Sequence, residues 1–78
     1  MDFSLADLGV GETAIITDVL DGPVQAKLLE MGLVPGERIR LKFKAPFGDP
    51  LSVVVAGYQL AIRKDVALSI KVKLEEHA

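Results

Sequence analysis

Short strand-like runs separated by turn signals limit this chain to a small β-structure. Five runs rich in Val, Ile, Leu and Thr follow one another along the sequence. We expect strands over residues 12–20, 37–45, 51–56, 60–63 and 68–74. Strands at this spacing in a chain of 78 residues predict an all-β domain whose sheet closes, or nearly closes, into a barrel. We expect a single domain over residues 1–78, with an ordered core from about residue 4 to residue 74.

The run 37–45 alternates more strictly than any other part of the chain, as a strand with one buried face does. The predicted core face carries Ile39, Leu41 and Phe43. The opposite face carries four cations, which we call the basic stripe: Arg38, Arg40, Lys42 and Lys44. Such a stripe is an alternative binding surface for phosphates or an acidic protein. It is also the pattern of a solvated barrel exterior whose cations pair with acids on neighbouring strands.

One helix is predicted between the first and second strands. Asp21 or Gly22 is a suitable N-cap, and Pro23 suits the first helical position because the N–H that it lacks has no partner there. The helix should end at about Met31. A helix of about nine residues is unstable alone in water, so we expect it to pack on the sheet.

The end of this helix carries two turn signals. Gly32 is placed to adopt the left-handed conformation after the last helical residue, with Leu33 folding back onto Leu28 as in a Schellman motif. Pro35 and Gly36 then occupy the two central positions of a predicted type II turn.

The two sides of the predicted helix differ in character. Val24, Leu28 and Met31 cluster on one side and should face the core, whereas Ala26 and Leu29 lie well away from them. An exposed Leu beside an Ala and a tight turn is a candidate anchor for a protein partner. The hypothetical partner surface comprises Ala26, Leu29, Gly32, Leu33 and Pro35.

The remaining segments read as turns. Two prolines place residues 46–50 in a loop, with Asp49 as its internal cap. We expect residues 57–59 and 65–67 to turn, and Ser4 and Asp7 to cap a short helical turn in the manner of a capping box. Fold-maintaining roles are predicted for Gly32, Gly36, Pro46, Gly48, Asp49 and Pro50.

The residue types present argue against an enzyme and against a strong metal site. The chain has no cysteine, and His77, its single histidine, lies next to the C-terminus. A catalytic base needs a fixed geometry, and a strong transition-metal site needs His or Cys ligands. We therefore expect no catalytic residue, no cofactor and no metal ligand. The absence of cysteine and of a recognisable leader favours the cytoplasm.

Three segments together resemble the hallmarks of the FeoA family. They are residues 27–36 (KLLEMGLVPG), 45–50 (APFGDP) and 57–67 (GYQLAIRKDVA), and residues 4–8 with Gly11 and Glu12 resemble the family's opening. The resemblance covers the chain from about residue 4 to residue 72. It implies an SH3-like barrel with one inserted helix. It also implies a non-enzymatic, cytoplasmic accessory of ferrous iron uptake that binds the cytosolic region of the FeoB permease to regulate or assemble it.

Three alternatives remain at this point. A small barrel with a basic stripe could bind nucleic acid, but the net charge of −2 and an inward-facing Phe43 argue against this. A direct iron carrier or sensor would need ligands that the sequence lacks, unless two chains share carboxylates. The family's fold also occurs as the C-terminal module of repressors similar to DtxR, and here no helix-turn-helix precedes the barrel.

Overall fold

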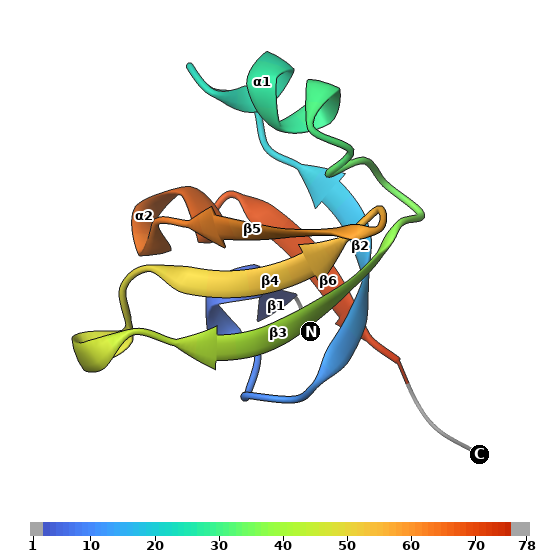
Figure 1. The fold of residues 1–78 in the computed structure, drawn as a ribbon. Coiled ribbons are helices and arrows are strands. Elements are labelled where there is room, and N and C mark those ends of the chain that lie inside the picture. The colour runs from blue at the N-terminus through green and yellow to red at the C-terminus, as the bar shows by residue number, and fades with distance from the viewer. Residues whose placement is uncertain (1–2, 76–78) are drawn as a thin grey trace.

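A computed structural model describes residues 3–75 as a six-stranded sheet with two short α-helices (Figure 1). The strands are β1 (Phe3–Ser4), β2 (Thr13–Val19), β3 (Arg38–Lys44), β4 (Leu51–Val55), β5 (Tyr58–Ile62) and β6 (Ile70–Leu74). The α-helices are α1 (Gln25–Glu30) and α2 (Lys64–Ala67), and two 3-10 turns, η1 and η2, span Leu5–Asp7 and Pro46–Gly48. The predicted mostly-β class, with a helix inserted before β3, is confirmed.

The strands pair antiparallel throughout, in the order β1-β6-β2-β3-β4-β5. In Figure 1 the sheet curls on itself, so that β6 passes behind β4 and β5. Its two outermost strands are β1 and β5. The curl matches the nearly closed barrel predicted from the strand spacing.

The core lies inside this curl and is almost entirely aliphatic. β3, β4 and β6 contribute alternate apolar residues to it, as the two-residue period of a strand requires, whereas a register shift in β2 separates Ile16 from Val19 by three positions. The buried strand residues are Ala14, Ile16, Val19, Ile39, Leu41, Leu51, Val53, Val55, Ile62, Ile70 and Val72. Leu5, Leu8, Leu28, Leu33 and Ala67 complete the core from turns and helices.

The N-terminal residues form a capped turn and a strand that was not predicted. The Asp7 carboxylate accepts hydrogen bonds from the Ser4 N–H (2.9 Å) and hydroxyl (3.2 Å), so the predicted interaction between these residues is confirmed. Phe3 lies opposite Val72 in β6. The strand consists of only two residues, too few for a periodic pattern to be visible in the sequence.

The second half of the chain departs from prediction at two turns. β5 begins at Tyr58, not at residue 60, because Ala56 and Gly57 form a two-residue hairpin turn with φ of 51° and 89°. Asp65, Val66 and Ala67 were predicted to form a tight turn and instead belong to α2. An Ala at positive φ, as Ala56 is, is uncommon, which explains why the sequence placed the hairpin turn at residues 57–59 and not at 56–57.

Helix α1 is shorter at its start than predicted and stands at one end of the barrel (Figure 1). Pro23 lies in a turn ahead of the helix, which begins at Gln25. Asp21 was a predicted N-cap, but its carboxylate instead accepts a hydrogen bond from the Gln25 side chain (3.0 Å). That amide also donates to the carbonyl oxygen of Val19 (3.1 Å), which ties α1 to the end of β2.

Candidate interaction surfaces

The C-terminal end of α1 is fixed by its own backbone. The Leu33 N–H donates to the Leu28 carbonyl (3.0 Å) and the Gly32 N–H to the Leu29 carbonyl (3.1 Å), which is the predicted Schellman motif. Gly32 has φ of +94°, and a Cβ there would lie 3.1 Å from the Cβ of Ala56. The motif therefore directs the chain after the helix against the β4–β5 hairpin turn.

The predicted type II turn follows directly. Gly36 has φ of +96°, and the Glu37 N–H donates to the Val34 carbonyl (3.1 Å), so that Pro35 and Gly36 are its central residues. The Gly36 N–H also donates to the Ile16 carbonyl (2.7 Å). These bonds attach the turn to β2 and hold Pro35 at the surface.

The structure divides the five residues of the predicted partner surface. Ala26, Leu29 and Pro35 are exposed, and 37% of Leu29 is accessible to solvent. Gly32 is half-buried. Leu33 is fully buried, so its place on a contact surface was a wrong prediction. The Schellman motif turns Leu33 inward, because this motif brings the second residue after the helix cap back toward Leu28.

A groove of about 230 Å³ separates α1 from β5 and α2. It is lined by Val24, Lys27, Leu28, Met31, Ala61, Ile62, Arg63 and Val66. Val24, Leu28 and Met31 were predicted to face the core, but only Leu28 is buried; Met31 is half-buried and Val24 is 38% exposed. The apolar side of α1 therefore forms one wall of a groove, which helical periodicity alone cannot distinguish from core packing.

Arg38, Arg40 and Lys42 of the basic stripe lie on the exterior of β3, and all four cations of the stripe are exposed. Lys44 lies opposite the buried Leu51, so it points to the other face of the sheet at the exposed end of the strand. Arg38 forms an ion pair with Glu75, at 2.7 Å between Nε and Oε2. Lys42 donates to the Gln59 amide oxygen (3.3 Å), a neutral partner. Within residues 3–75, no ion pair engages Arg40, Lys42 or Lys44. The acid that pairs with Arg38 follows β6, which β2 separates from β3, so the described ion pairs include none between the stripe and an acid on a neighbouring strand.

A bulge in β3 reverses the predicted orientation of Phe43. Leu41 lies opposite Val53, but Phe43 lies opposite Ser52, so three residues of β3 face two residues of β4. Phe43 is 51% exposed, and its assignment to the core was wrong. Simple alternation fails here because an extra residue in one strand moves every later side chain to the other face.

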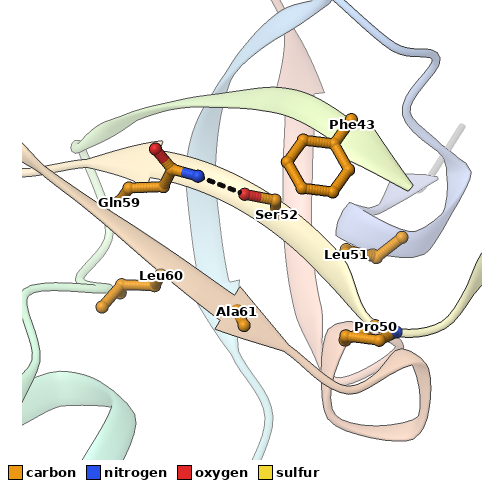
Figure 2. A pocket seen from close by; sticks show the side chains of 7 residues that line it. All are labelled: Phe43, Pro50, Leu51, Ser52, Gln59, Leu60 and Ala61. Atoms are coloured by element: carbon orange, nitrogen blue, oxygen red, sulfur yellow. Dashed lines mark hydrogen bonds between the residues drawn. The ribbon is translucent and has the colours of Figure 1, made fainter. Parts of the chain in front are cut away.

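Phe43 covers one side of a shallow hollow of about 360 Å³ on the outer face of β4 and β5. Figure 2 shows the ring beside Ser52, with Gln59 on the other side of that serine. The Gln59 amide donates to the buried Ser52 hydroxyl (2.8 Å). Together with the hydrogen bond from Lys42 to Gln59, this bond forms a polar chain across β3, β4 and β5. The Phe43 ring lies beside this chain and near the cations of the stripe (Figure 2).

The loop between β3 and β4 displays a second aromatic ring. Phe47 is fully exposed and has φ of 68°, in the left-handed region that bulky residues rarely adopt. The Gly48 N–H donates to the Ala45 carbonyl (2.8 Å), and the Ala45 N–H donates to the Pro50 carbonyl (3.0 Å). Two cross-loop hydrogen bonds thus hold the turn that carries Phe47.

Asp49 was predicted to cap this loop internally, and that prediction was wrong. Its carboxylate accepts a hydrogen bond from the Lys64 N–H (3.0 Å), fifteen residues along the chain. Lys64 is the first residue of α2, so the loop supplies the N-terminal cap of a distant helix. Capping of α2 therefore explains the position of this aspartate.

The described residues include no group of three or more His, Cys, Asp or Glu side chains that could hold a metal ion. None of the helices in residues 3–75 is long and apolar enough to cross a membrane. His77, the histidine next to the C-terminus, lies outside the described residues. Two surfaces of the described residues are candidates for binding: the α1 region, and the exterior of β3 with its loop.

A family model described as the FeoA domain matches residues 3–74. The chain belongs to the FeoA family. The family is one of ferrous iron transport, and a relative from Porphyromonas gingivalis (strain ATCC BAA-308 / W83) is an Fe(2+) transport protein A/Fe(2+) transporter FeoB fusion protein. It is 34% identical over 71 residues, which are 90% of this chain and 8% of that protein. The chain thus spans a small fraction of that relative's length.

Solved FeoA structures have the same fold. A FeoA-like protein from Clostridium acetobutylicum is 31% identical, with a TM-score of 0.87 over 99% of this chain and 93% of that one. FeoA from Stenotrophomonas maltophilia, complexed with zinc and described as a prokaryotic SH3 domain protein, is 30% identical. Its TM-score is 0.82 over 91% of this chain and 89% of that one. The SH3-like architecture is therefore shown.

The FeoA hallmark segments contain turns of the barrel together with parts of α1, β5 and α2. Gly36 and Gly48 both have positive φ, of 96° and 80°, which side chains other than glycine rarely tolerate. Pro46 and Pro50 bound the loop that carries Phe47. A fold-maintaining role for these residues stays a prediction, with a physical reason at each glycine.

Proposed function

We propose that this chain is a cytoplasmic, non-catalytic accessory of ferrous iron uptake that binds the cytosolic region of a FeoB-type permease. The observation that carries the proposal is the Porphyromonas gingivalis relative, in which a FeoA-like segment and FeoB share one polypeptide. Fusion keeps two proteins at a high effective concentration, which is favourable when they act in contact. A separate small chain must achieve the same association through a surface of its own.

The surface best suited to this contact is the exposed side of α1 and the turn after it. Leu29 presents an apolar side chain, with Ala26 one helical turn before it. Pro35 lies at the surface of the turn that follows. An apolar anchor ringed by polar residues is the usual arrangement of a binding hot spot. Lys27 and Glu30 supply that polar surround on the same helix.

The groove on the other flank of α1 extends the same surface. Its apolar wall includes Met31, Ile62 and Val66, and Lys27 and Arg63 also line it. A partner side chain that enters this groove would contact α1 and α2 together. The contact would then depend on the Schellman motif, because that motif fixes where α1 ends.

The test is an NMR titration of labelled protein with the cytosolic region of the cognate permease. We expect chemical shift changes concentrated at Ala26, Leu29 and Met31, and a large loss of affinity for Leu29→Lys. Val10→Lys is the matched control, since Val10 is 62% exposed and precedes β2, whereas α1 follows that strand. This control should bind like the unaltered protein.

Two other outcomes count against parts of the proposal. Shift changes centred on Arg40 and Lys42 would retain the permease as partner but move the site to the basic stripe. If no chemical shift changes occur even at high permease concentration, binding to the cytosolic region is rejected.

A further inference from the structure

Two exposed phenylalanines and several exposed cations occur along β3 and the loop that follows it. Phe43 and Phe47 are four residues apart, one on the strand exterior and one in the loop that follows it. Arg40, Lys42 and Lys44 are all exposed, and no ion pair engages them within residues 3–75. The β3 bulge creates this combination, because it brings Phe43 to the face that already carries Arg40 and Lys42.

The loop holds Phe47 outward against the usual preference of an apolar side chain. The ring is fully exposed, so it packs on nothing in the described residues. The backbone at Phe47 is nonetheless held by two cross-loop bonds, and Asp49 fastens the loop to α2. A bulky residue held at positive φ is strained, and such strain is found mainly at functional positions.

We propose that the outer face of β3 and the loop after it bind the surface of an anionic lipid bilayer. Phe47 and Phe43 enter the headgroup region, while Arg40 and Lys42 lie against lipid phosphates. Aromatic side chains favour this interfacial depth, and cations near an anionic leaflet add attraction. This contact is separate from the proposed permease site on α1 and does not depend on it.

Two features favour a bilayer over nucleic acid. Single-stranded nucleic acid binds to successive aromatic platforms in a basic groove, whereas here one ring lies on the sheet face and the other protrudes from a loop. The whole chain also carries a net charge of −2, which disfavours a polyanion that spans much of its surface. A bilayer touches only one side of the molecule, so acids elsewhere matter less. The acid in the loop itself, Asp49, has its carboxylate hydrogen-bonded to the Lys64 N–H.

Vesicle flotation tests the proposal with the full chain. We expect binding to vesicles of equimolar phosphatidylcholine and phosphatidylglycerol, weak binding to phosphatidylcholine alone, and release at high salt. Arg40→Glu together with Lys42→Glu should weaken binding by about thirtyfold or more. The matched control is Lys71→Glu together with Lys73→Glu, two cations at the same spacing on β6, which should retain binding. If the protein binds neutral and anionic vesicles equally, or if the β6 control variant loses as much binding as the β3 variant, the proposed attraction between the β3 cations and lipid phosphates is overturned.

Phe47 provides the most specific readout. Phe47→Asn should weaken binding by about tenfold without unfolding the loop, because Asn tolerates positive φ. Phe47→Trp introduces the chain's single tryptophan. Its emission should shift to shorter wavelength on binding and be quenched by brominated lipids. Vesicle binding without quenching would overturn insertion of the loop.

The two proposed sites can fail independently. Leu29→Lys should remove the chemical shift changes caused by the permease and leave vesicle binding intact. Phe47→Asn should weaken vesicle binding and leave the chemical shift changes intact. If Phe47→Asn removes permease shifts and leaves flotation unchanged, the loop contacts protein and the lipid proposal is rejected. Tighter binding to a single-stranded oligonucleotide than to anionic vesicles, lost with Arg40→Glu and Lys42→Glu, would also reject it.

Discussion

Two neighbouring regions of this barrel are held by different kinds of hydrogen bond, one mostly by bonds between residues close in sequence and the other by side-chain bonds between residues far apart in sequence. In the helix–turn segment, residues 25–37, most fixing hydrogen bonds join residues no more than five apart, such as Leu33 to Leu28. In the β3 arm, residues 38–50, the side-chain bonds reach across the fold. Lys42 bonds Gln59, Asp49 bonds Lys64, and Arg38 bonds Glu75, at separations of 17, 15 and 37 residues. The first region follows local rules, whereas the second depends on pairing with distant strands.

The strongest test of this difference replaces Leu41 and Phe43 by alanine, one at a time. Leu41 is fully buried in the middle of the sheet, so Leu41→Ala should destabilise the fold by about 3 to 5 kcal/mol. Phe43→Ala should cost less than about 1 kcal/mol, because the bulge leaves that ring half exposed. Urea unfolding measures both. Similar losses for the two variants would mean that Phe43 faces the core and that no bulge exists.

A parallel pair tests the helix–turn segment. Leu33→Ala should cost about 2 to 4 kcal/mol, because Leu33 is fully buried where the Schellman motif returns it to Leu28. Leu29→Ala should change stability by less than about 0.5 kcal/mol, since Leu29 is more than a third exposed. Thermal unfolding would distinguish them. If Leu33→Ala is as stable as the unaltered protein, Leu33 is a surface residue and not part of the core.

Gly32→Ala measures how strictly the local rule applies. The left-handed φ costs about 1 to 2 kcal/mol for a residue with a Cβ, and the new methyl group would lie 3.1 Å from Ala56. We expect a loss of about 1 to 3 kcal/mol in chemical unfolding. Gly36→Ala is the control, because φ is similar but nothing lies within 4 Å. A smaller loss at Gly36 would isolate the contact with the hairpin turn.

Asp49 tests the long-range bonding of the β3 arm. Asp49→Ala removes the acceptor for the Lys64 N–H and should cost about 1 kcal/mol, as the loss of a helix cap does. Amide hydrogen exchange at Lys64 should accelerate at the same time. Asp49→Asn keeps an acceptor oxygen and should recover much of the loss. Faster exchange at Gly48 with no change at Lys64 would instead indicate an internal cap.

The smallest effect is expected at the ion pair of Arg38 with Glu75. The Arg38 side chain is 67% exposed, and exposed pairs contribute about 0 to 1 kcal/mol. Arg38→Met should therefore change stability by less than about 1 kcal/mol, and the change should shrink with added salt. A loss that is large and independent of salt would show that this pair, rather than strand pairing, secures that end of β3.

The candidate surfaces were predictable to different degrees. Helical periodicity separated Ala26 and Leu29 from the apolar side of α1, and both are exposed. It also assigned Val24 and Met31 to the core, because the pattern cannot tell a packed face from a groove wall. For the basic stripe, the alternating pattern correctly predicted that the cations are exposed and wrongly predicted that Phe43 faces the core. A bulge has no sequence signature when neither of its residues is glycine or proline.

The sequence by itself determined the class of fold, the helix end and the type II turn, because these depend on residues a few positions apart. Glycine at positive φ, proline at a turn and alternating apolar residues each act within that distance. Tertiary structure alone decided the β3 bulge, the cap that Asp49 gives α2 and the groove beside α1. Each arises when strands distant in sequence adopt a register, and the energy of that register is shared among many side chains at once.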